Sequence, residues 1–347
     1  MAALISVSVS VVGQASSASA ALPVTWDGST LGVTLFENAT SSVIGCNAVG
    51  GFTLNGVAPS PAVLCGEIAS IVVFNLHSDG LGVYQKTGTI DLRGVTKPPF
   101  GRLTATEVQG FDFGGTIHDS PFTDQLSAGS NAKLYGYAGK DRMWPSVQTN
   151  EAKVTNIELW GGDGADSLSG DGAINARLEG GAGLGRSVGC SSIRFGQRRR
   201  RWRCHQAANG RQAQVFGGPG DDVIVVTFES ASLVDAGSGV DQLKVISLRS
   251  ADGLTAIRVP DPQPKTAITE AGKQIDAEQF EKIEISRATK LTITMDPSTA
   301  YVARAVGQLT VKVPGGVWNV EGLQVTAAGL APVSWNVVPA QLTIIAA

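Results

Sequence analysis

One nine-residue pattern recurs in the middle of the chain and constrains the fold more than any other feature. The segment GGDGADSLS begins at Gly161 and GGPGDDVIV begins at Gly217, and both fit G-G-x-G-x-D-x-U-x, where U is a large aliphatic residue. Glycine lets the backbone turn sharply, and the x-U-x tripeptide after the aspartate is a short strand with its aliphatic side chain pointing inward. The pattern therefore predicts stacked turns and short strands.

Weaker copies extend the pattern in both directions. The segment AGSGVDQLK at Ala236 lacks only the first glycine, GYAGKDRMW at Gly136 lacks only the second, and DQL from Asp124 keeps the core without the glycines. Together the copies cover roughly residues 119–244. The aliphatic positions of the three best copies are expected to form one stripe of the core: Leu168, Ile224 and Leu243.

These nonapeptides resemble the RTX, or hemolysin-type, calcium-binding repeats. The resemblance implies an all-β fold, a parallel β-roll or β-helix solenoid in which two nonapeptides make one coil and calcium lies between the loops of successive coils. It implies metal-ligand roles for Asp166, Asp222 and Asp241, with Asp141 as a weaker candidate. The loop glycines would add backbone ligands, since Ca²⁺ takes about six to eight oxygens: Gly161, Gly162, Gly164, Gly217, Gly218, Gly220, Gly237 and Gly239.

The spacing of the repeats agrees with coils of about two nonapeptides. Asp241 follows Asp222 by 19 residues, but the second half of each coil is degenerate, as in SGDGAINAR and TFESASLV. We therefore expect calcium sites along one edge of the solenoid and patchy or absent sites along the other. The alternative is that these segments are glycine and aspartate turns of a β-protein that binds no metal.

An arginine-rich stretch, FGQRRRRWRC at residues 195–204, interrupts the repeats in a chain of net charge −3. A repeat begins at Gly180 and then fails, the pattern resumes at Val215, and the 37 residues from Leu178 to Val215 match two coils in length. The peptide RRRRWRC can be encoded by codons that read DGDGGD one base later. We therefore interpret residues 184–214 as a compensated frameshift or sequencing error, with a solvated insertion loop and a polyanion-binding patch as alternatives.

The regions on either side of the repeats have the composition of strands and turns. Segments rich in Val, Thr and Ile between glycines predict a strand-rich N-terminal region, 21–118, and a strand-rich C-terminal region, 245–347. Periodicity leaves open whether each flank continues the solenoid or closes as a separate sandwich. A helical turn is expected only in QIDAEQFEK, from Gln274 to Lys282.

The first residues predict export. An apolar run from Ala2 to Val12 and the small residues of Ala18-Ser19-Ala20 match a secretory signal peptide over 1–20, although basic residues are missing and a first β-strand is the alternative. No run reaches the roughly 18 apolar residues of a transmembrane helix. We therefore expect a secreted or cell-surface protein of bacterial type without a transmembrane segment.

Four cysteines fall into two pairs. In an exported protein, Cys46 and Cys65 are expected to form a structural disulfide. The spacing of Cys190 and Cys204, in the anomalous segment 184–214, matches no zinc pattern.

No catalytic constellation is evident in the sequence. The segment GRSVG at Gly185 matches the G-x-S-x-G nucleophile elbow, but the three histidines, at 77, 118 and 205, have no recognisable catalytic setting. We therefore expect an exported protein in which calcium is structural, with no catalytic site and no nucleic-acid partner. The alternatives are a surface adhesion or interaction module with an unknown extracellular or cell-surface partner and, less favoured, a secreted RTX-type hydrolase.

Overall fold

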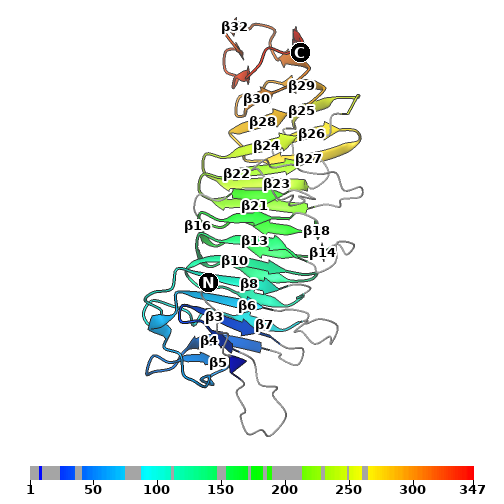
Figure 1. The fold of residues 1–347 in the computed structure, drawn as a ribbon. Helices are drawn as coiled ribbons and strands as arrows, with labels where there is room; N and C mark the ends of the chain where they lie inside the picture. The colour runs from blue at the N-terminus through cyan, green and yellow to red at the C-terminus, as the bar shows by residue number, and fades with distance from the viewer. Residues whose placement is uncertain are drawn as a thin grey trace, which may run out of the picture. The chain divides into compact units, whose positions relative to one another are not determined.

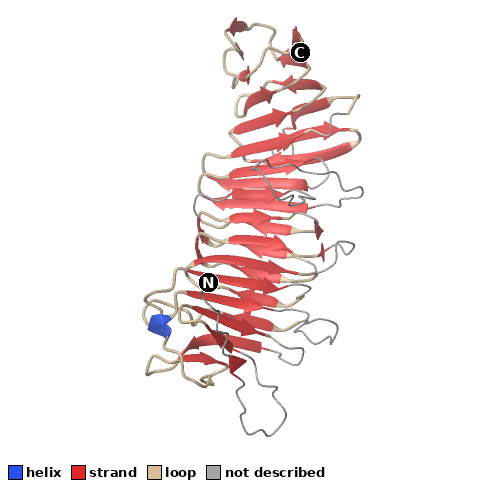
Figure 2. Ribbon diagram, viewed as in Figure 1, coloured by secondary structure: helices blue, strands red, loops and turns tan. Residues whose placement is uncertain are grey.

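The computed structural model describes residues 8–9, 24–35, 41–74, 87–110, 113–146, 154–170, 173–182, 186–189, 213–227, 231–247, 250–259 and 265–347. Strands account for nearly all secondary structure in these ranges, and the one helical segment among them is the 3-10 turn η1 (Cys65–Glu67) (Figures 1 and 2). The expected all-β class is confirmed. The chain divides into two compact units, Met1–Leu168 and Ser169–Ala347, so the repeat segment 119–244 contributes to both.

Unit 1 consists mainly of two sheets between which the chain alternates. Sheet A has the order β1 (Ser8–Val9), β2 (Val24–Trp26), β3 (Thr30–Thr34), β6 (Ser70–Phe74), β8 (Ala105–Gly110), β10 (Thr123–Ala128), β13 (Arg142–Pro145) and β17 (Ser167–Ser169). Sheet B has the order β5 (Phe52–Leu54), β4 (Ser41–Cys46), β7 (Thr89–Asp91), β9 (Thr116–His118), β11 (Lys133–Tyr135) and β15 (Glu158–Trp160). Pairing is parallel from β3 onward in sheet A and from β4 onward in sheet B.

Short strands in the loops complete unit 1. Strand β12 (Ala138–Gly139) pairs in parallel with β16 (Asp163–Gly164), and β14 (Val154–Thr155) lies before β15.

The core of unit 1 follows from the strand alternation. In β8 the residues alternate between half-buried and buried, so one face of sheet A is apolar. Parallel pairing in register then places Val108 beside Leu126 and Leu126 beside Met143, and all three are fully buried. Burying each such side chain stabilises the fold by about 1.5–3 kcal/mol. Each added strand therefore extends one row of aliphatic side chains.

Unit 2 repeats this arrangement. Its sheet A has the order β20 (Arg186–Gly189), β22 (Val223–Thr227), β24 (Gln242–Ile246), β28 (Lys282–Ser286), β30 (Ala300–Arg304), β34 (Val333–Trp335), β33 (Gln324–Thr326) and β32 (Asn319–Glu321). Its sheet B has the order β19 (Arg177–Glu179), β21 (Ala213–Pro219), β23 (Ala231–Ser238), β27 (Lys273–Glu278), β26 (Lys265–Glu270), β25 (Leu254–Val259), β29 (Lys290–Thr294), β31 (Gln308–Val313) and β35 (Gln341–Ala346). The short strand β18 (Ala173–Ile174) precedes β19.

The expected aliphatic stripe is buried in both units. Leu168 in unit 1 and Ile224 and Leu243 in unit 2 are fully buried, and Ile224 lies directly opposite Leu243 in the register of β22 and β24. The flanks extend these sheets, because β6 and β8 pair in parallel ahead of β10, and β28 and β30 pair in parallel after β24. The described strands of the flanks therefore continue the sheets of the repeats and form no separate sandwich.

Two sequence-based expectations are wrong. The helical turn expected from Gln274 to Lys282 is replaced by β27 and the start of β28, because Ile275 and Ala277 alternate with more exposed neighbours in the two-residue period of a strand. The two-coil length is also wrong: Leu178 pairs directly with Val215 on the adjacent strands β19 and β21. The intervening residues thus span one repeat of the alternation between sheets.

Several other expectations fall on residues outside the described ranges. These are residues 190–212 of the anomalous segment 184–214, which include Cys190, Cys204 and His205. His77 and Gly185 of the GRSVG segment also lie outside the described ranges. Of the expected signal peptide, only Ser8–Val9 is described, and it pairs antiparallel with β2. In the ranges that are described, no helix has the length and apolarity needed to cross a membrane.

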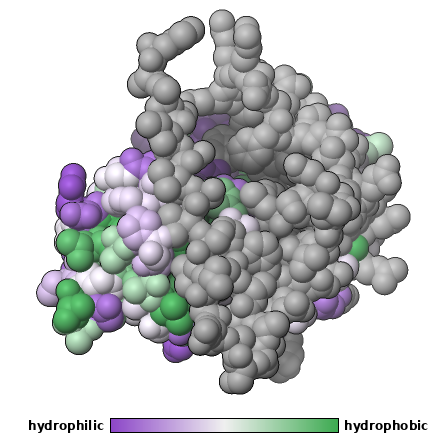
Figure 3. Space-filling view, turned by 60° about the horizontal axis from the view of Figure 1, so that its bottom comes forward, coloured by the Kyte–Doolittle hydropathy of each residue, from purple (hydrophilic) through white to green (hydrophobic). Residues whose placement is uncertain are grey.

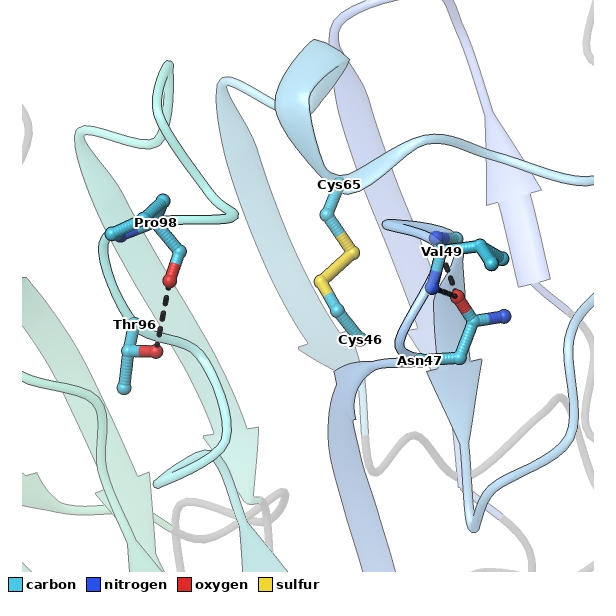
Figure 4. Close-up of a disulfide and its surroundings, with 7 residues drawn as sticks. Cys46, Asn47, Val49, Cys65, Thr96 and Pro98 are labelled. Atoms are coloured by element: carbon cyan, nitrogen blue, oxygen red, sulfur yellow. Dashed lines mark hydrogen bonds between the residues drawn. A yellow bond between two sulfur atoms is a disulfide. The ribbon is translucent and has the colours of Figure 1, made fainter.

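A disulfide joins Cys46 to Cys65 at the N-terminal end of unit 1 (Figure 4). The Cα atoms are 6.4 Å apart, within the usual range for a disulfide. Asn47 orders the turn beside the bond, because its Oδ1 accepts the backbone N–H groups of Val49 (3.1 Å) and Gly51 (2.8 Å). Hydrophobic and hydrophilic residues are intermingled over the coloured surface in Figure 3. Val49, in the turn beside the disulfide, is exposed.

Candidate metal site

Five buried aspartates stand where loops lead into sheet A. Asp124 lies near the start of β10, and each of the others immediately precedes a strand: Asp141 before β13, Asp166 before β17, Asp222 before β22 and Asp241 before β24. A carboxyl group at such a junction lies close to the backbone of the neighbouring repeat. It can therefore accept hydrogen bonds from N–H groups that the loops leave outside the sheets.

In unit 1 these aspartates form a ladder of hydrogen bonds. The backbone N–H of Thr106 donates to Asp124 Oδ1 (2.7 Å), that of Asp124 to Asp141 Oδ1 (3.0 Å), and that of Asp141 to Asp166 Oδ1 (2.9 Å). Asp124 and Asp141 thus each accept from the preceding repeat and donate to the next, and Asp166 accepts from Asp141. We call Asp124, Asp141 and Asp166 the unit 1 ladder.

Unit 2 has a corresponding ladder made of Asp222, Asp241 and Glu281. The backbone N–H of Asp222 donates to Asp241 Oδ1 (2.7 Å), and that of Asp241 donates to Glu281 Oε2 (2.7 Å). Sequence reasoning missed Glu281, although Glu281-Lys282-Ile283 keeps the spacing of an acidic residue two positions before a buried aliphatic one. A search that accepted glutamate at the aspartate position could have found it.

One oxygen on several ladder carboxyls remains unused within the described part of the chain. Oδ2 of Asp141, Asp166 and Asp241 is buried and has no hydrogen-bond partner there. Burial, followed by the charges of Asp124 and Asp166, raises the pKa of Asp141 to about 8. Burial likewise raises the pKa of Asp166 and of Asp241. A buried carboxylate in this state favours a proton or a metal cation as its partner.

The surroundings of Asp241 are acidic, as the sequence suggests. After burial, the pKa of Asp241 is raised by the charges of Glu281, Asp221 and Asp235. Two of these side chains also order the loops, because Asp221 Oδ1 accepts the N–H of Val240 (2.9 Å) and Asp235 Oδ1 accepts that of Gly237 (3.1 Å). The acidic groups therefore combine local hydrogen bonding with mutual repulsion.

The predicted glycines lie in these loops and have a steric function. At the first position, Gly161 and Gly217 are buried; at the second and fourth positions the backbone has positive φ, at Gly162, Gly164, Gly218, Gly220, Gly237 and Gly239. A Cβ on Gly164 would lie 1.9 Å from the carbonyl oxygen of Gly139, and one on Gly217 would lie 2.7 Å from Asp222 Oδ2. The loops can therefore stack closely only where these side chains are absent.

Asp119, Asp124 and Asp141 form the one group of three acidic residues in the described ranges that can hold a metal ion. All three are buried, and one ligand oxygen from each lies within 4.8 Å of the other two. We call these residues the triad. Sequence reasoning identified Asp141 and noted Asp124 as part of a degenerate repeat, but it missed Asp119. Asp119 precedes Asp124 by five residues, the same separation as between the first glycine and the aspartate of the intact nonapeptides. The other predicted ligands, Asp166, Asp222 and Asp241, lie in the ladders but not in this group.

Comparison with known proteins adds no assignment. A scan against protein-family models, a search of curated proteins and a search of solved structures each found no match to this chain.

Proposed function

We propose that the chain is an exported calcium-binding protein whose repeats form a parallel β-roll or β-helix solenoid, with calcium in a structural role and no catalytic site. The observation that carries the proposal is the set of buried carboxylate oxygens on Asp141, Asp166 and Asp241 that have no hydrogen-bond partner among the described residues. Calcium binds hard oxygen ligands such as these in flexible geometry. A bound cation would offset the repulsion between aspartates and favour the folded state by mass action.

Parallel strand pairing supports the solenoid part of the proposal. Ladder residues recur after 17 residues between Asp124 and Asp141 and after 19 between Asp222 and Asp241, close to two nonapeptides. The interval lengthens to 25 residues between Asp141 and Asp166, so the repeats tolerate insertions in their loops. The disulfide between Cys46 and Cys65 supports export, because such bonds persist in oxidising compartments.

Calcium titration of the full chain after chelator treatment tests the proposal. We expect calcium at roughly 10⁻⁴–10⁻³ M to increase β-sheet circular dichroism and the melting temperature. Free calcium at about 100 times Kd would add about 2.7 kcal/mol to the free energy of unfolding, or roughly 5–10 °C in Tm for a unit of this size. Magnesium should act poorly, because it requires a tight octahedron.

Asparagine variants connect the response to the repeats. Asp222→Asn combined with Asp241→Asn keeps an oxygen that can accept the ladder hydrogen bonds but removes both charges, and we expect most of the unit 2 response to be lost. The matched control is Asp163→Asn, since Asp163 is an exposed residue of a glycine loop. The absence of any calcium-dependent change in the wild-type chain up to about 10 mM would refute the proposal, because that is an order above the typical range.

An interaction module is the second candidate, and an aromatic row on sheet B of unit 1 favours it. The rings of His118 and Tyr135 stack with centroids 5.3 Å apart, and those of Tyr135 and Trp160 stack at 4.6 Å. Because His118 and Trp160 stack on Tyr135, the row would present mainly the ring edge of Tyr135 to a ligand. Tyr135→Ala would impair binding to a surface glycan if the row were a binding surface, and it would leave the calcium response unchanged.

A further inference from the structure

We propose that Asp119, Asp124 and Asp141 form a divalent-cation site in unit 1 that includes a carboxylate from outside the glycine loops. Asp119 belongs to no glycine-rich nonapeptide, and the inference does not require that the other repeats bind calcium. The cation would be held by carboxylate oxygens from three neighbouring segments of the chain: the residue after β9, the start of β10 and the residue before β13.

The position of Asp119 explains why a third carboxylate is present at this level of the described structure. Asp119 follows β9 and donates its backbone N–H to Tyr135 O (3.0 Å), just as Gly136 follows β11 and donates to Trp160 O (2.8 Å). A Cβ on Gly136 would lie 2.3 Å from Gly161 O and 2.7 Å from Asp141 Oδ2. A side chain is therefore excluded at the glycine, whereas at Asp119 the same position carries a buried carboxylate.

The hydrogen bonds of the triad leave oxygens available for a cation. Thr106 Oγ1 donates to Asp119 Oδ1 (3.2 Å), and Ser120 Oγ donates to Asp124 Oδ2 (2.6 Å). Oδ2 of Asp119 and Oδ2 of Asp141 are buried and have no hydrogen-bond partner in the described part of the chain. Asp119 itself is fully buried, so its second oxygen has no access to solvent for compensation.

Charge gives the second reason to expect a cation. In the described ranges, no Lys, Arg or His forms an ion pair with any of the three carboxyls. Three ionised carboxylates this close would repel one another strongly in a medium of low dielectric constant. A divalent cation would neutralise most of that charge, and the all-oxygen donor set suits a hard ion such as Ca²⁺. A proton shared between Asp119 and Asp124 is the competing means of neutralisation.

Isothermal titration calorimetry of the full chain with CaCl₂ after chelator treatment tests the site. We expect Asp119→Asn to bind one calcium equivalent fewer than the wild type, because the change keeps the side-chain size and removes one ligand charge. Asp163→Asn, the exposed control, should keep the wild-type stoichiometry, and Asp241→Asn in unit 2 should keep the equivalent that Asp119→Asn loses. If Asp119→Asn matched the wild type in stoichiometry and affinity, a shared proton would account for the cluster and the inference would be wrong.

The design separates this inference from the proposed function. If Asp119→Asn loses calcium binding and the Asp222 and Asp241 changes have no effect, the triad is supported and calcium binding by the unit 2 repeats is refuted. If the Asp222 and Asp241 changes reduce binding and Asp119→Asn does not, the triad alone is refuted. Asp119→Glu gives an independent reading if the asparagine variant does not fold. This variant keeps the charge but displaces it by one methylene, so we expect about tenfold weaker calcium binding, or a loss of about 1.4 kcal/mol of binding free energy. Unchanged calcium affinity in this variant would also refute the site.

Discussion

Raising the pH should destabilise the cation-free protein, and Asp141 sets the expected size of this effect. Its pKa is about 8 in the folded chain because of burial and the nearby charges of Asp124 and Asp166, whereas an aspartate in an unfolded chain titrates near 3.9. Between these values the folded protein holds a proton that the unfolded chain has released. The free energy of unfolding therefore falls as pH rises through this window.

The magnitude follows from one differential proton. Linkage gives a loss of about 1.4 kcal/mol per pH unit, so raising the pH from 6.5 to 8 should remove up to about 2 kcal/mol through Asp141 alone. Asp119 acts in the same direction, because burial and the charges of Asp124 and Asp141 raise its pKa well above the usual range. Burial lowers the pKa of His118, which makes stability rise with pH until the unfolded histidine has lost its proton, about one unit above its ordinary pKa of about 6.5.

Urea unfolding in chelator-containing buffer, followed by tryptophan fluorescence and circular dichroism, measures the slope. Asp141→Asn should flatten it, because the asparagine oxygen can still accept the N–H of Asp124 while the titrating group is gone. Saturating calcium should also flatten it if the cation replaces the proton. A free energy of unfolding that stays constant or increases from pH 6.5 to 8 in the chelated wild type would show that the reasoning about buried carboxyls is wrong.

Two further changes test the loops and the N-terminal end. Gly164→Ala should lower the free energy of unfolding by at least about 2 kcal/mol, because the new Cβ would meet Gly139 O. Gly28 is also at positive φ, but no described atom lies within 4 Å of its Cβ position, so Gly28→Ala should have the smaller effect in the same urea assay. Reduction of the Cys46–Cys65 bond, which spans 19 residues, should lower the free energy of unfolding by about 3 kcal/mol. Mass spectrometry of non-reduced peptides tests the bond directly, and finding both thiols free in exported material would contradict it.

The sequence alone determined the all-β class and much of the local geometry. Glycines at fixed offsets before an aspartate indicate turns at positive φ, and the aliphatic residue two positions after the aspartate indicates a strand with one buried face. In the structure Gly164 has positive φ, and Asp166 and Leu168 are buried. The pairing of Cys46 with Cys65 was also accessible, because both lie in strand-and-turn sequence, whereas Cys190 and Cys204 lie in the anomalous segment 184–214. These properties depend on residues a few positions apart, where sequence patterns are informative.

Only the tertiary structure decided which residues meet across the repeats. Asp119 and Thr106 are 13 residues apart and Asp241 and Glu281 are 40 apart, yet each pair is hydrogen-bonded. A constant repeat length would place neither pair together, and it also misplaced Val215 relative to Leu178. The physical reason is that insertions leave the sheets as loops without disturbing the register, since strand pairing depends on buried faces and backbone hydrogen bonds. Contacts across the longer insertions therefore have no periodic signature in the sequence.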